Sequence, residues 1–302
     1  MTTQYAIEGN NITKKLKGFN LDIDDLKVPK GFATALIGEN GAGKTTLLNI
    51  LSGLRLDYKG DITFFGRYSD KEKEDNGNVK NRIGYTGTGK YYLPQWTVRD
   101  IENISKILFE DFSEDRFRKY CDELAIFPHG QLDMKKPNSS FSDGMKVKLM
   151  LAGVLSRDTD MLILDEPASP LDPLMRDKLC QLISEYINNG NGEKSVFFST
   201  HNISDMENIT DYAIIMENGQ IVEQGFVEDL KEKYIVIKGD AADTQKAKDI
   251  LYTITTNPYG FEGICLSENL DKLAGLNVTK EIPTLYQISV AVMKNNTKIV
   301  MR

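Results

Sequence analysis

The sequence has few cysteines and histidines, no long apolar run and no excess of basic residues. Its three cysteines and two histidines are scattered through 302 residues, which excludes a disulfide framework and argues against a cluster of metal ligands. Nothing approaches the ~18 consecutive apolar residues of a membrane-spanning helix, and the first residues lack the basic-then-apolar pattern of a signal peptide. We therefore expect a cytosolic chain with reduced thiols and no direct insertion into a membrane.

The charge balance is acidic, with 44 acidic and 37 basic residues and a formal net charge of −7. Proteins that bind nucleic acid neutralise several phosphates with a basic patch or stripe, and this sequence shows none. We therefore expect no nucleic-acid partner. Hydrophobic residues make up 40% of the chain, which is enough for a packed core, and the length favours one large domain with an appendage.

A glycine-rich stretch from Gly38 to Thr46 stands between two apolar segments. It follows the apolar run Phe32–Ile37 and leads into a segment with helical periodicity. The apolar positions predicted to share that helical face are Leu47, Ile50, Leu51 and Leu54. A glycine-rich loop between a buried strand and a helix is the context of a P-loop, whose backbone amides bind phosphate groups.

Each P-loop position then has an expected role. Lys44 reaches the β- and γ-phosphates of a nucleotide, and the Thr45 hydroxyl is placed for Mg²⁺. The residues expected to bind the phosphates are Asn40, Gly41, Ala42, Gly43, Lys44, Thr45 and Thr46. The alternative is a glycine-rich turn that binds nothing.

Two further segments end in polar residues suited to nucleotide hydrolysis. Asp165 and Glu166 follow the apolar run Met161–Leu164, so Asp165 is expected to hold Mg²⁺ and Glu166 to polarise the attacking water. His201 follows the apolar strand Ser195–Ser199 and is expected to hydrogen-bond the γ-phosphate. The alternative role of the acidic pair is to begin a polar turn. The alternative for His201 is a polar residue at a strand end that forms its hydrogen bonds within the fold.

The order of strands and helices predicts an α/β fold with a P-loop NTPase core. Its sheet is mostly parallel and has helices on both faces, so the P-loop, the acidic pair and His201 all lie at the carboxyl ends of strands. Short strands in residues 4–31 predict an antiparallel β subdomain. Residues 69–82 are charged and contain an Asn-Gly pair, which predicts a solvated loop. A helical insert is expected at about 90–157, and a small α/β appendage at 230–302 after an ATPase domain at 1–229.

The combined motifs resemble those of the ATP-binding cassette (ABC) ATPases. The resemblance covers about residues 3–230 and rests on the P-loop, Phe141-Ser-Asp-Gly-Met145, Asp165-Glu166, Ser169-Pro-Leu-Asp172 and Ser199-Thr-His201. It implies ATP and Mg²⁺ as ligands and a head-to-tail homodimer. Each ATP would lie between the P-loop of one subunit and Ser142, Asp143 and Gly144 of the other, and Asp172 would link the two sites.

Three departures from the family pattern suggest slower turnover, although the catalytic set remains. Asp143 stands where the family's Leu-Ser-Gly-Gly-Gln signature has glycine and places a carboxylate near an anion, unless it only caps a helix. Thr88 stands at the position of the glutamine that contacts Mg²⁺, with Gln95 as a weaker alternative. Leu16 replaces the aromatic residue that stacks on adenine, and Phe19 could substitute for it.

The signature variant Phe141–Met145 is similar to those of bacterial exporters of peptides, bacteriocins and antibiotics. The resemblance therefore implies a motor subunit that drives a separate ABC-2-type permease and lies peripherally on the inner face of the plasma membrane. Residues Tyr91–Thr97 would then face the permease, or else pack the core of the insert. The alternatives are a soluble ABC ATPase without a transport role and a weakly hydrolytic regulatory module.

Overall fold

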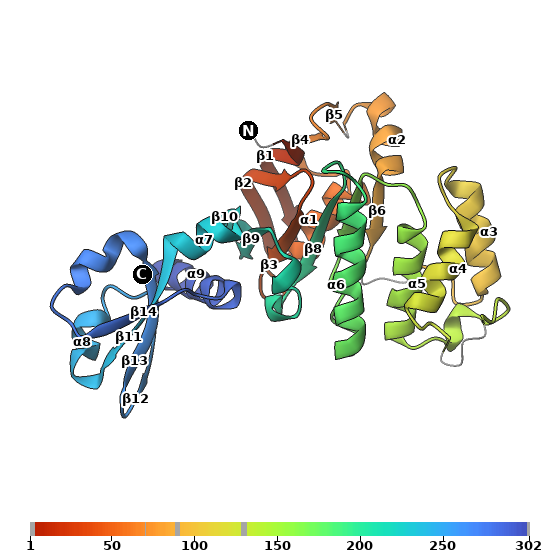
Figure 1. Ribbon diagram of the computed structural model, residues 1–302. Coiled ribbons are helices and arrows are strands. Elements are labelled where there is room, and N and C mark those ends of the chain that lie inside the picture. Colours follow the sequence, from red (N-terminus) through yellow and green to blue (C-terminus); the bar gives the residue numbers. More distant parts are fainter. Residues whose placement is uncertain (1–3, 70, 88–90, 128–131, 301–302) are drawn as a thin grey trace.

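The computed structural model describes residues 4–69, 71–87, 91–127 and 132–300, and its strands form three sheets (Figure 1). The central sheet has the strand order β10-β9-β3-β8-β7-β6. Its members are β3 (Ala33–Ile37), β6 (Ile83–Thr86), β7 (Met161–Leu164), β8 (Ser195–Thr200), β9 (Tyr212–Glu217) and β10 (Gln220–Phe226). Every pairing is parallel except that of β10 with β9. The predicted, mostly parallel sheet is therefore confirmed.

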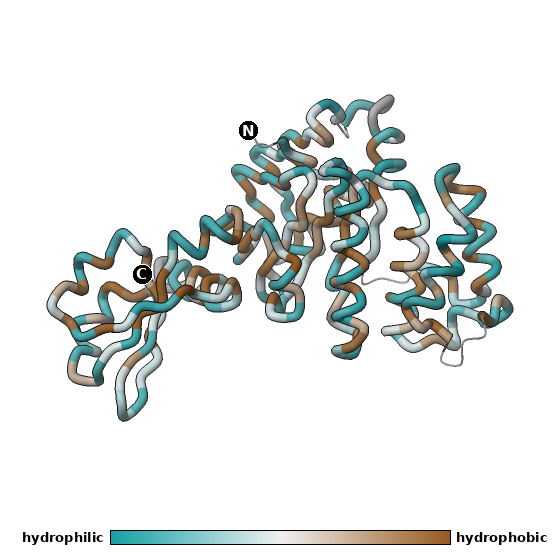
Figure 2. Tube along the Cα trace, viewed as in Figure 1, coloured by the Kyte–Doolittle hydropathy of each residue, from teal (hydrophilic) through white to brown (hydrophobic). Residues whose placement is uncertain are grey.

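The central strands are buried along their length and mostly apolar, because both faces of the sheet are covered. All residues of β3, β7 and β8 are buried. Figure 2 shows this pattern: apolar segments occupy the central strands, whereas the outer helices alternate between apolar and polar residues. The hairpin between β9 and β10 turns at Asn218 and Gly219, which both have positive φ, as the twist of a two-residue hairpin requires.

The antiparallel β subdomain is also confirmed, as a second sheet of order β2-β1-β4-β5. Its strands are β1 (Tyr5–Leu16), β2 (Phe19–Pro29), β4 (Lys59–Phe64) and β5 (Tyr68–Ser69). Helix α1 (Lys44–Leu51) packs between this sheet and the central one, because its apolar residues share one core cluster with both. The P-loop helix is therefore fixed from two sides.

Two sequence-based expectations in this region are wrong. Residues 73–82, expected to lie in a solvated loop, form helix α2 (Lys73–Arg82). Its buried Val79 packs into the core beside α1, and this tertiary contact outweighs the weak helix propensity of an Asn-Gly pair. Leu54 does not extend the buried face of α1, because that helix ends at Leu51. Leu54 is instead 66% exposed.

Helices α3 (Val98–Leu108), α4 (Glu114–Glu123) and α5 (Asp143–Leu155) lie together on one side of the central sheet (Figure 1). Each begins at a side-chain cap: Thr97, Ser113 and Ser142 accept hydrogen bonds from amides in the first turns, as N-cap residues do. Helix α6 (Pro173–Asn188) begins at Asp172 in the same way. The caps fix where each helix begins, including the helix that starts at Ser142.

The last part of the chain builds a third, antiparallel sheet of order β12-β13-β11-β14. Its elements are α7 (Val227–Lys233), β11 (Tyr234–Asp240), α8 (Thr244–Ala247), β12 (Thr253–Asn257), β13 (Gly260–Leu266), β14 (Val278–Glu281) and α9 (Leu285–Val300). No helix in the described part of the chain combines the length and apolarity needed to cross a membrane.

Helix α9 returns from the third sheet to the main core. Its buried residues Leu285, Ile288 and Ala291 belong to the same apolar cluster as residues of the central sheet. The expected boundary between residues 229 and 230 falls inside α7. The division into an ATPase domain and an appendage stays a prediction, and we expect the two parts to unfold together because they share a core.

Replacing Ile288 with alanine tests this shared core. Ile288 is fully buried, so we expect Ile288→Ala to lower the free energy of unfolding by about 2–5 kcal/mol and to shift the main unfolding transition in urea. Ile282→Ala, at an 80% exposed position just before α9, should change it by less than about 0.5 kcal/mol. A separate early transition in Ile288→Ala, with the main one unchanged, would contradict the shared core.

Candidate nucleotide-binding site

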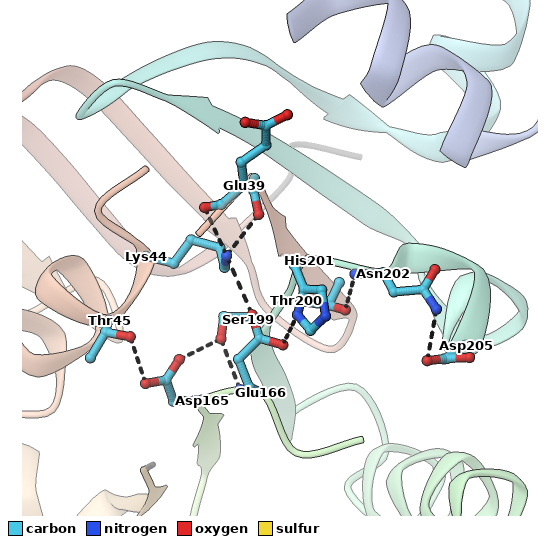
Figure 3. Close-up of polar contacts among 11 residues, drawn as sticks. Glu39, Lys44, Thr45, Asp165, Glu166, Ser199, Thr200, His201, Asn202 and Asp205 are labelled. Carbon is cyan, nitrogen blue, oxygen red and sulfur yellow. Dashed lines mark hydrogen bonds and ion pairs between the residues drawn. The ribbon is translucent and has the colours of Figure 1, made fainter. Parts of the chain in front are cut away.

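The parallel strands β3, β7 and β8 lie side by side, so their carboxyl ends bring three chain segments to one edge of the sheet. The glycine-rich loop follows β3, Asp165 and Glu166 follow β7, and His201 follows β8. Figure 3 shows their side chains converging, together with that of Ser199. The structure therefore brings together five residues predicted from separate motifs, which are Lys44, Thr45, Asp165, Glu166 and His201. We refer to these five residues and Ser199 as the strand-end cluster.

The glycines of the loop are required by backbone conformation and by close packing. Gly41 and Gly43 have φ values of 90° and 107°, in a region that favours glycine. A Cβ atom on Gly43 would lie 2.6 Å from the ring of Phe19, and one on Gly38 would lie 2.4 Å from the Met216 carbonyl oxygen. Phe19 thus packs against the phosphate-binding loop, and its role in stacking on adenine stays a prediction.

Lys44 curls back over the loop that precedes it. Its Nζ donates hydrogen bonds to the carbonyl oxygens of Gly38, at 2.7 Å, and Glu39, at 3.2 Å. The side chain is buried, and two carbonyl oxygens and one carboxylate oxygen of the described residues face its charge. Among the other predicted phosphate-binding positions, Asn40 is exposed, Ala42 is buried, and Thr46 lies in α1.

Asp165 is buried and receives hydrogen bonds on both carboxylate oxygens. Thr45 Oγ1 donates to Oδ2 at 2.9 Å, and Ser199 Oγ donates to Oδ1 at 2.6 Å. Mg²⁺ prefers oxygen ligands and is commonly held by one or two carboxylates together with substrate phosphates. The Thr45 hydroxyl and the Asp165 carboxylate fit that pattern. The described residues contain no cluster of three or more acidic, histidine or cysteine ligands, so the phosphates would have to complete the coordination.

Ser199 is a member of this cluster that the sequence reasoning missed. Besides donating to Asp165, its Oγ accepts a hydrogen bond from the Glu166 backbone amide at 2.9 Å. One buried hydroxyl therefore positions both acidic residues. The available signal was a serine directly after the apolar residues Val196–Phe198, two residues before His201.

Glu166 has a left-handed backbone, with φ of 50°, which costs energy for a residue other than glycine. Its Oε2 is 2.8 Å from His201 Nδ1, and its Oε1 is 3.3 Å from Lys44 Nζ. Oε1 is buried, yet it accepts no hydrogen bond from any described residue. Buried carboxylate oxygens are normally hydrogen-bonded, so this atom is suited to accept a bond from a bound molecule.

The signature residues form a second group at the start of α5. Ser142 Oγ accepts a hydrogen bond from the Met145 amide at 3.3 Å, and the exposed Asp143 pairs with Lys146 at 3.1 Å. A Cβ atom on Gly144 would lie 2.7 Å from the Pro170 carbonyl oxygen. The glycine therefore lets α5 begin against the loop that ends at Asp172, whose side chain caps α6 through the Met175 amide.

No hydrogen bond within the described ranges joins Ser142, Asp143, Gly144 or Asp172 to the strand-end cluster. Thr88 lies outside the described residues, and Gln95 is exposed in the loop before α3. Their predicted roles, like those of the other site residues, stay predictions.

The geometry defines the class of protein. A P-loop between β3 and α1, with a buried aspartate and a glutamate at the end of a parallel strand, is the arrangement of a P-loop nucleoside triphosphatase. Residues 21–169 match the family model described as ABC transporter. The chain therefore contains an ABC transporter ATP-binding domain.

Curated relatives and solved structures agree with this assignment. The chain is 29% identical over 255 residues to the bacitracin transport ATP-binding protein BcrA of Enterococcus faecalis, covering 83% of this chain and 79% of that protein. It is also 29% identical over 213 residues to the energy-coupling factor transporter ATP-binding protein EcfA2 of Methanospirillum hungatei. That match covers 68% of this chain but only 50% of the relative.

A solved ATP-binding subunit of an ABC transporter has the same fold. It superposes with a TM-score of 0.64 at 24% identity, covering 75% of this chain and 92% of that one. The P-loop NTPase fold and the sequence-based resemblance to the ABC family are both confirmed.

Replacing Ser199 with alanine tests its role in holding the acidic pair. The variant loses a hydrogen bond to a buried carboxylate, so we expect it to lower the free energy of unfolding by about 1–3 kcal/mol. The same substitution in an Asp165→Asn background should cost less, because the charge-assisted partner is already gone. Equal costs in both backgrounds, measured by urea denaturation, would show that the Ser199–Asp165 bond is not responsible.

Proposed function

We propose that this chain is the ATP-binding and ATP-hydrolysing motor subunit of a bacterial ABC exporter, driving transport through a separate ABC-2-type permease. The observation that carries the proposal is the strand-end cluster. It combines the P-loop lysine, oxygen ligands suited to Mg²⁺ and a buried glutamate oxygen that accepts no hydrogen bond from the described residues. The match to the ABC transporter family model supports the same function.

In the proposed reaction each residue of the cluster has one task. The loop amides from Gly41 to Thr45 bind the phosphates of ATP, and Lys44 exchanges its loop carbonyls for phosphate oxygens. Thr45 and Asp165 would hold Mg²⁺, which would supply positive charge beside the phosphates.

The two remaining residues act on the water and the γ-phosphate. Glu166 Oε1, which accepts no hydrogen bond from the described residues, accepts one from the attacking water. As an imidazolium, in which both ring nitrogens donate, His201 would hold Glu166 through Nδ1, the nitrogen within 2.8 Å of Oε2, and bond the γ-phosphate through Nε2.

The proposed dimer supplies the second half of each site. The N-terminus of α5 carries the Ser142 hydroxyl and the positive end of a helix dipole, which together suit a γ-phosphate held by another subunit. Asp143 opposes this with a negative charge, but its carboxylate pairs with Lys146. We therefore expect weakened, not abolished, clamping of ATP. Asp172 caps α6 two residues after Pro170, whose carbonyl oxygen packs against Gly144, and in the proposed dimer it would link the two sites.

A surface groove supports a separate membrane partner. It has a volume of about 420 Å³ and is lined mainly by apolar side chains, among them Leu54, Tyr91, Trp96, Leu108 and Phe109. Leu54, Tyr91 and Leu108 are exposed, although apolar side chains of this size bury readily against a partner. We propose that a cytosolic segment of the permease binds here, which would keep the subunit at the inner face of the plasma membrane.

The exporter assignment has two supports. The signature variant with Asp143 and Met145 is similar to those of bacterial exporters of peptides, bacteriocins and antibiotics. The match to the bacitracin transport protein covers 83% of the chain. Because residues 1–229 make up only about three quarters of the sequence, that match must extend into the proposed appendage.

The test of the enzymatic claim is phosphate release by Glu166→Gln. We expect the variant to keep ATP binding but to lose hydrolysis by about 100-fold or more, because the amide cannot take up a proton from water. Glu193→Gln, which changes an exposed glutamate outside the cluster, should hydrolyse at the parent rate. If the purified parent chain hydrolyses no ATP, or if Glu166→Gln hydrolyses it normally, a binding or regulatory module becomes the better account.

A charge placed in the groove tests whether the membrane partner binds there. Leu54→Asp places a charge on the groove, so we expect it to reduce co-purification of a polytopic membrane protein at least tenfold while leaving basal hydrolysis unchanged. Ile282→Asp changes an exposed aliphatic position outside the groove and should retain the partner. Affinity capture from detergent-solubilised membranes, followed by mass spectrometry, measures both. Equal recovery with the two variants would place the partner elsewhere.

A further inference from the structure

Asn138 is a buried polar residue that lies just before the signature segment, which we define as Phe141–Gly144. It is 6% exposed. Its side-chain Nδ2 donates hydrogen bonds to the carbonyl oxygens of Tyr92, at 3.0 Å, and Leu93, at 3.5 Å. Both acceptors belong to residues 91–96, which we call the groove loop because Tyr91, Tyr92 and Trp96 line the apolar groove. Asn138 thus joins the groove to the signature.

Backbone bonds extend this connection. The amide of Asn138 donates to the Trp96 carbonyl at 2.8 Å, and the amide of Ser139 donates to the Pro94 carbonyl at 2.8 Å. Next to them, Thr97 and Pro137 form an isolated β-bridge. The groove loop and residues 136–139 are therefore held as one hydrogen-bonded unit.

The backbone between Asn138 and the signature segment is short, and hydrogen bonds and packing restrict its conformation. Residues Asn138–Ser140 form one turn of 3₁₀ helix, and the Phe141 amide donates back to the Asn138 carbonyl at 3.2 Å. The Phe141 side chain is buried in the main core, and the next residue, Ser142, caps α5. A displacement of the groove loop must therefore move Asn138 and, through one turn, Ser142.

The chemistry of Asn138 indicates that its donor group is what the fold requires. Its Oδ1 is buried and has no hydrogen-bond partner among the described residues, which is costly for an amide oxygen. An apolar side chain of similar size would avoid that cost, but it could not donate to the Tyr92 and Leu93 carbonyls. The amide is therefore explained by the two bonds to the groove loop.

We propose that Asn138 is a positioning residue that fixes Ser142 relative to the groove loop, and so couples occupation of the groove to the clamping of ATP across the dimer. This rests on the proposed function, because it requires that Ser142 act on ATP held by a second subunit. In the proposed dimer, each site joins the P-loop of one subunit to the signature of the other. An Asn138 variant should therefore have a damaged signature and an intact P-loop.

The first measurement is ATP-dependent dimerisation, followed by light scattering in a Glu166→Gln background that retains ATP. We expect Asn138→Leu and the milder Asn138→Ala to raise the dimer dissociation constant about tenfold or more, while ATP affinity of the monomer stays unchanged. Ser139→Ala, an exposed neighbour, should behave like the parent. If the parent itself stays monomeric with ATP and Mg²⁺, the proposed dimer fails and this inference fails with it.

Mixing variants separates a signature defect from a folding defect. One subunit carries Asn138→Leu with its own P-loop intact, and the other carries Lys44→Ala with its own signature intact, both in the Glu166→Gln background. The heterodimer in their mixture contains one site with two undamaged halves. These halves are the P-loop of the Asn138→Leu subunit and the signature of the Lys44→Ala subunit. We expect this mixture to bind ATP and dimerise as well as a mixture of the Glu166→Gln parent with Lys44→Ala. A weaker response would mean that Asn138→Leu damages more than the signature, which would overturn the proposal.

Trp96, the sole tryptophan of the sequence, gives a spectroscopic test of the coupling itself. If groove loop and signature move together, ATP-driven dimerisation of the parent changes Trp96 emission. Asn138→Leu, at a protein concentration high enough to restore the dimer, should lose most of that change, and Ser139→Ala should keep it. An unchanged response in Asn138→Leu, or no response in the parent, would contradict the coupling.

Discussion

The ammonium group of Lys44 is shared among the Gly38 and Glu39 carbonyls and the Glu166 carboxylate, and the site depends on this arrangement. Glu166 reaches it through a left-handed backbone that costs about 1–3 kcal/mol. Hydrogen bonds to charged groups contribute about 1.5–3 kcal/mol each. The contacts of Glu166 with His201 and Lys44, together with the Ser199 bond to its amide, are therefore enough to offset the strain. Removing the charge of Lys44 would leave Glu166 Oε1 without its ion-pair partner.

The same arrangement explains how a bound nucleotide would reorganise the site. Phosphate oxygens compete with the loop carbonyls for Lys44 because they are charged acceptors, and charge-assisted bonds are about twice as strong as neutral ones. If Lys44 turned to phosphate, its contact with Glu166 Oε1 would weaken, and that oxygen would be free to accept a bond from water. In the proposed reaction, one lysine would then couple hydrolysis to nucleotide binding. The signature, which lies at a separate helix start and carries its own acidic residue, adds a second condition through the proposed dimer.

The parts of the fold predicted from sequence are those set by local pattern. Glycines at fixed spacing before Lys44 and Thr45 define the P-loop, and four apolar residues before Asp165 define a strand covered on both faces. The features missed depend on distant contacts. Ser199 matters because β8 lies beside β7. Helix α2 buries Val79 in a core cluster that draws on two sheets, and Asn138 is explained by carbonyls more than forty residues away. Periodicity carries no information about such pairings.

The most direct test of the account is calorimetric titration of the purified chain with ATP, with and without Mg²⁺, beside the Lys44→Ala variant. The account predicts that the parent binds ATP and that Mg²⁺ strengthens the binding. It also predicts that Lys44→Ala weakens binding at least tenfold, or about 1.4 kcal/mol. Lys15→Ala, which changes a lysine in β1 outside the cluster, should bind like the parent. Equal affinity of the parent and Lys44→Ala, or no binding by the parent, would contradict the assignment of the strand-end cluster as the ATP site.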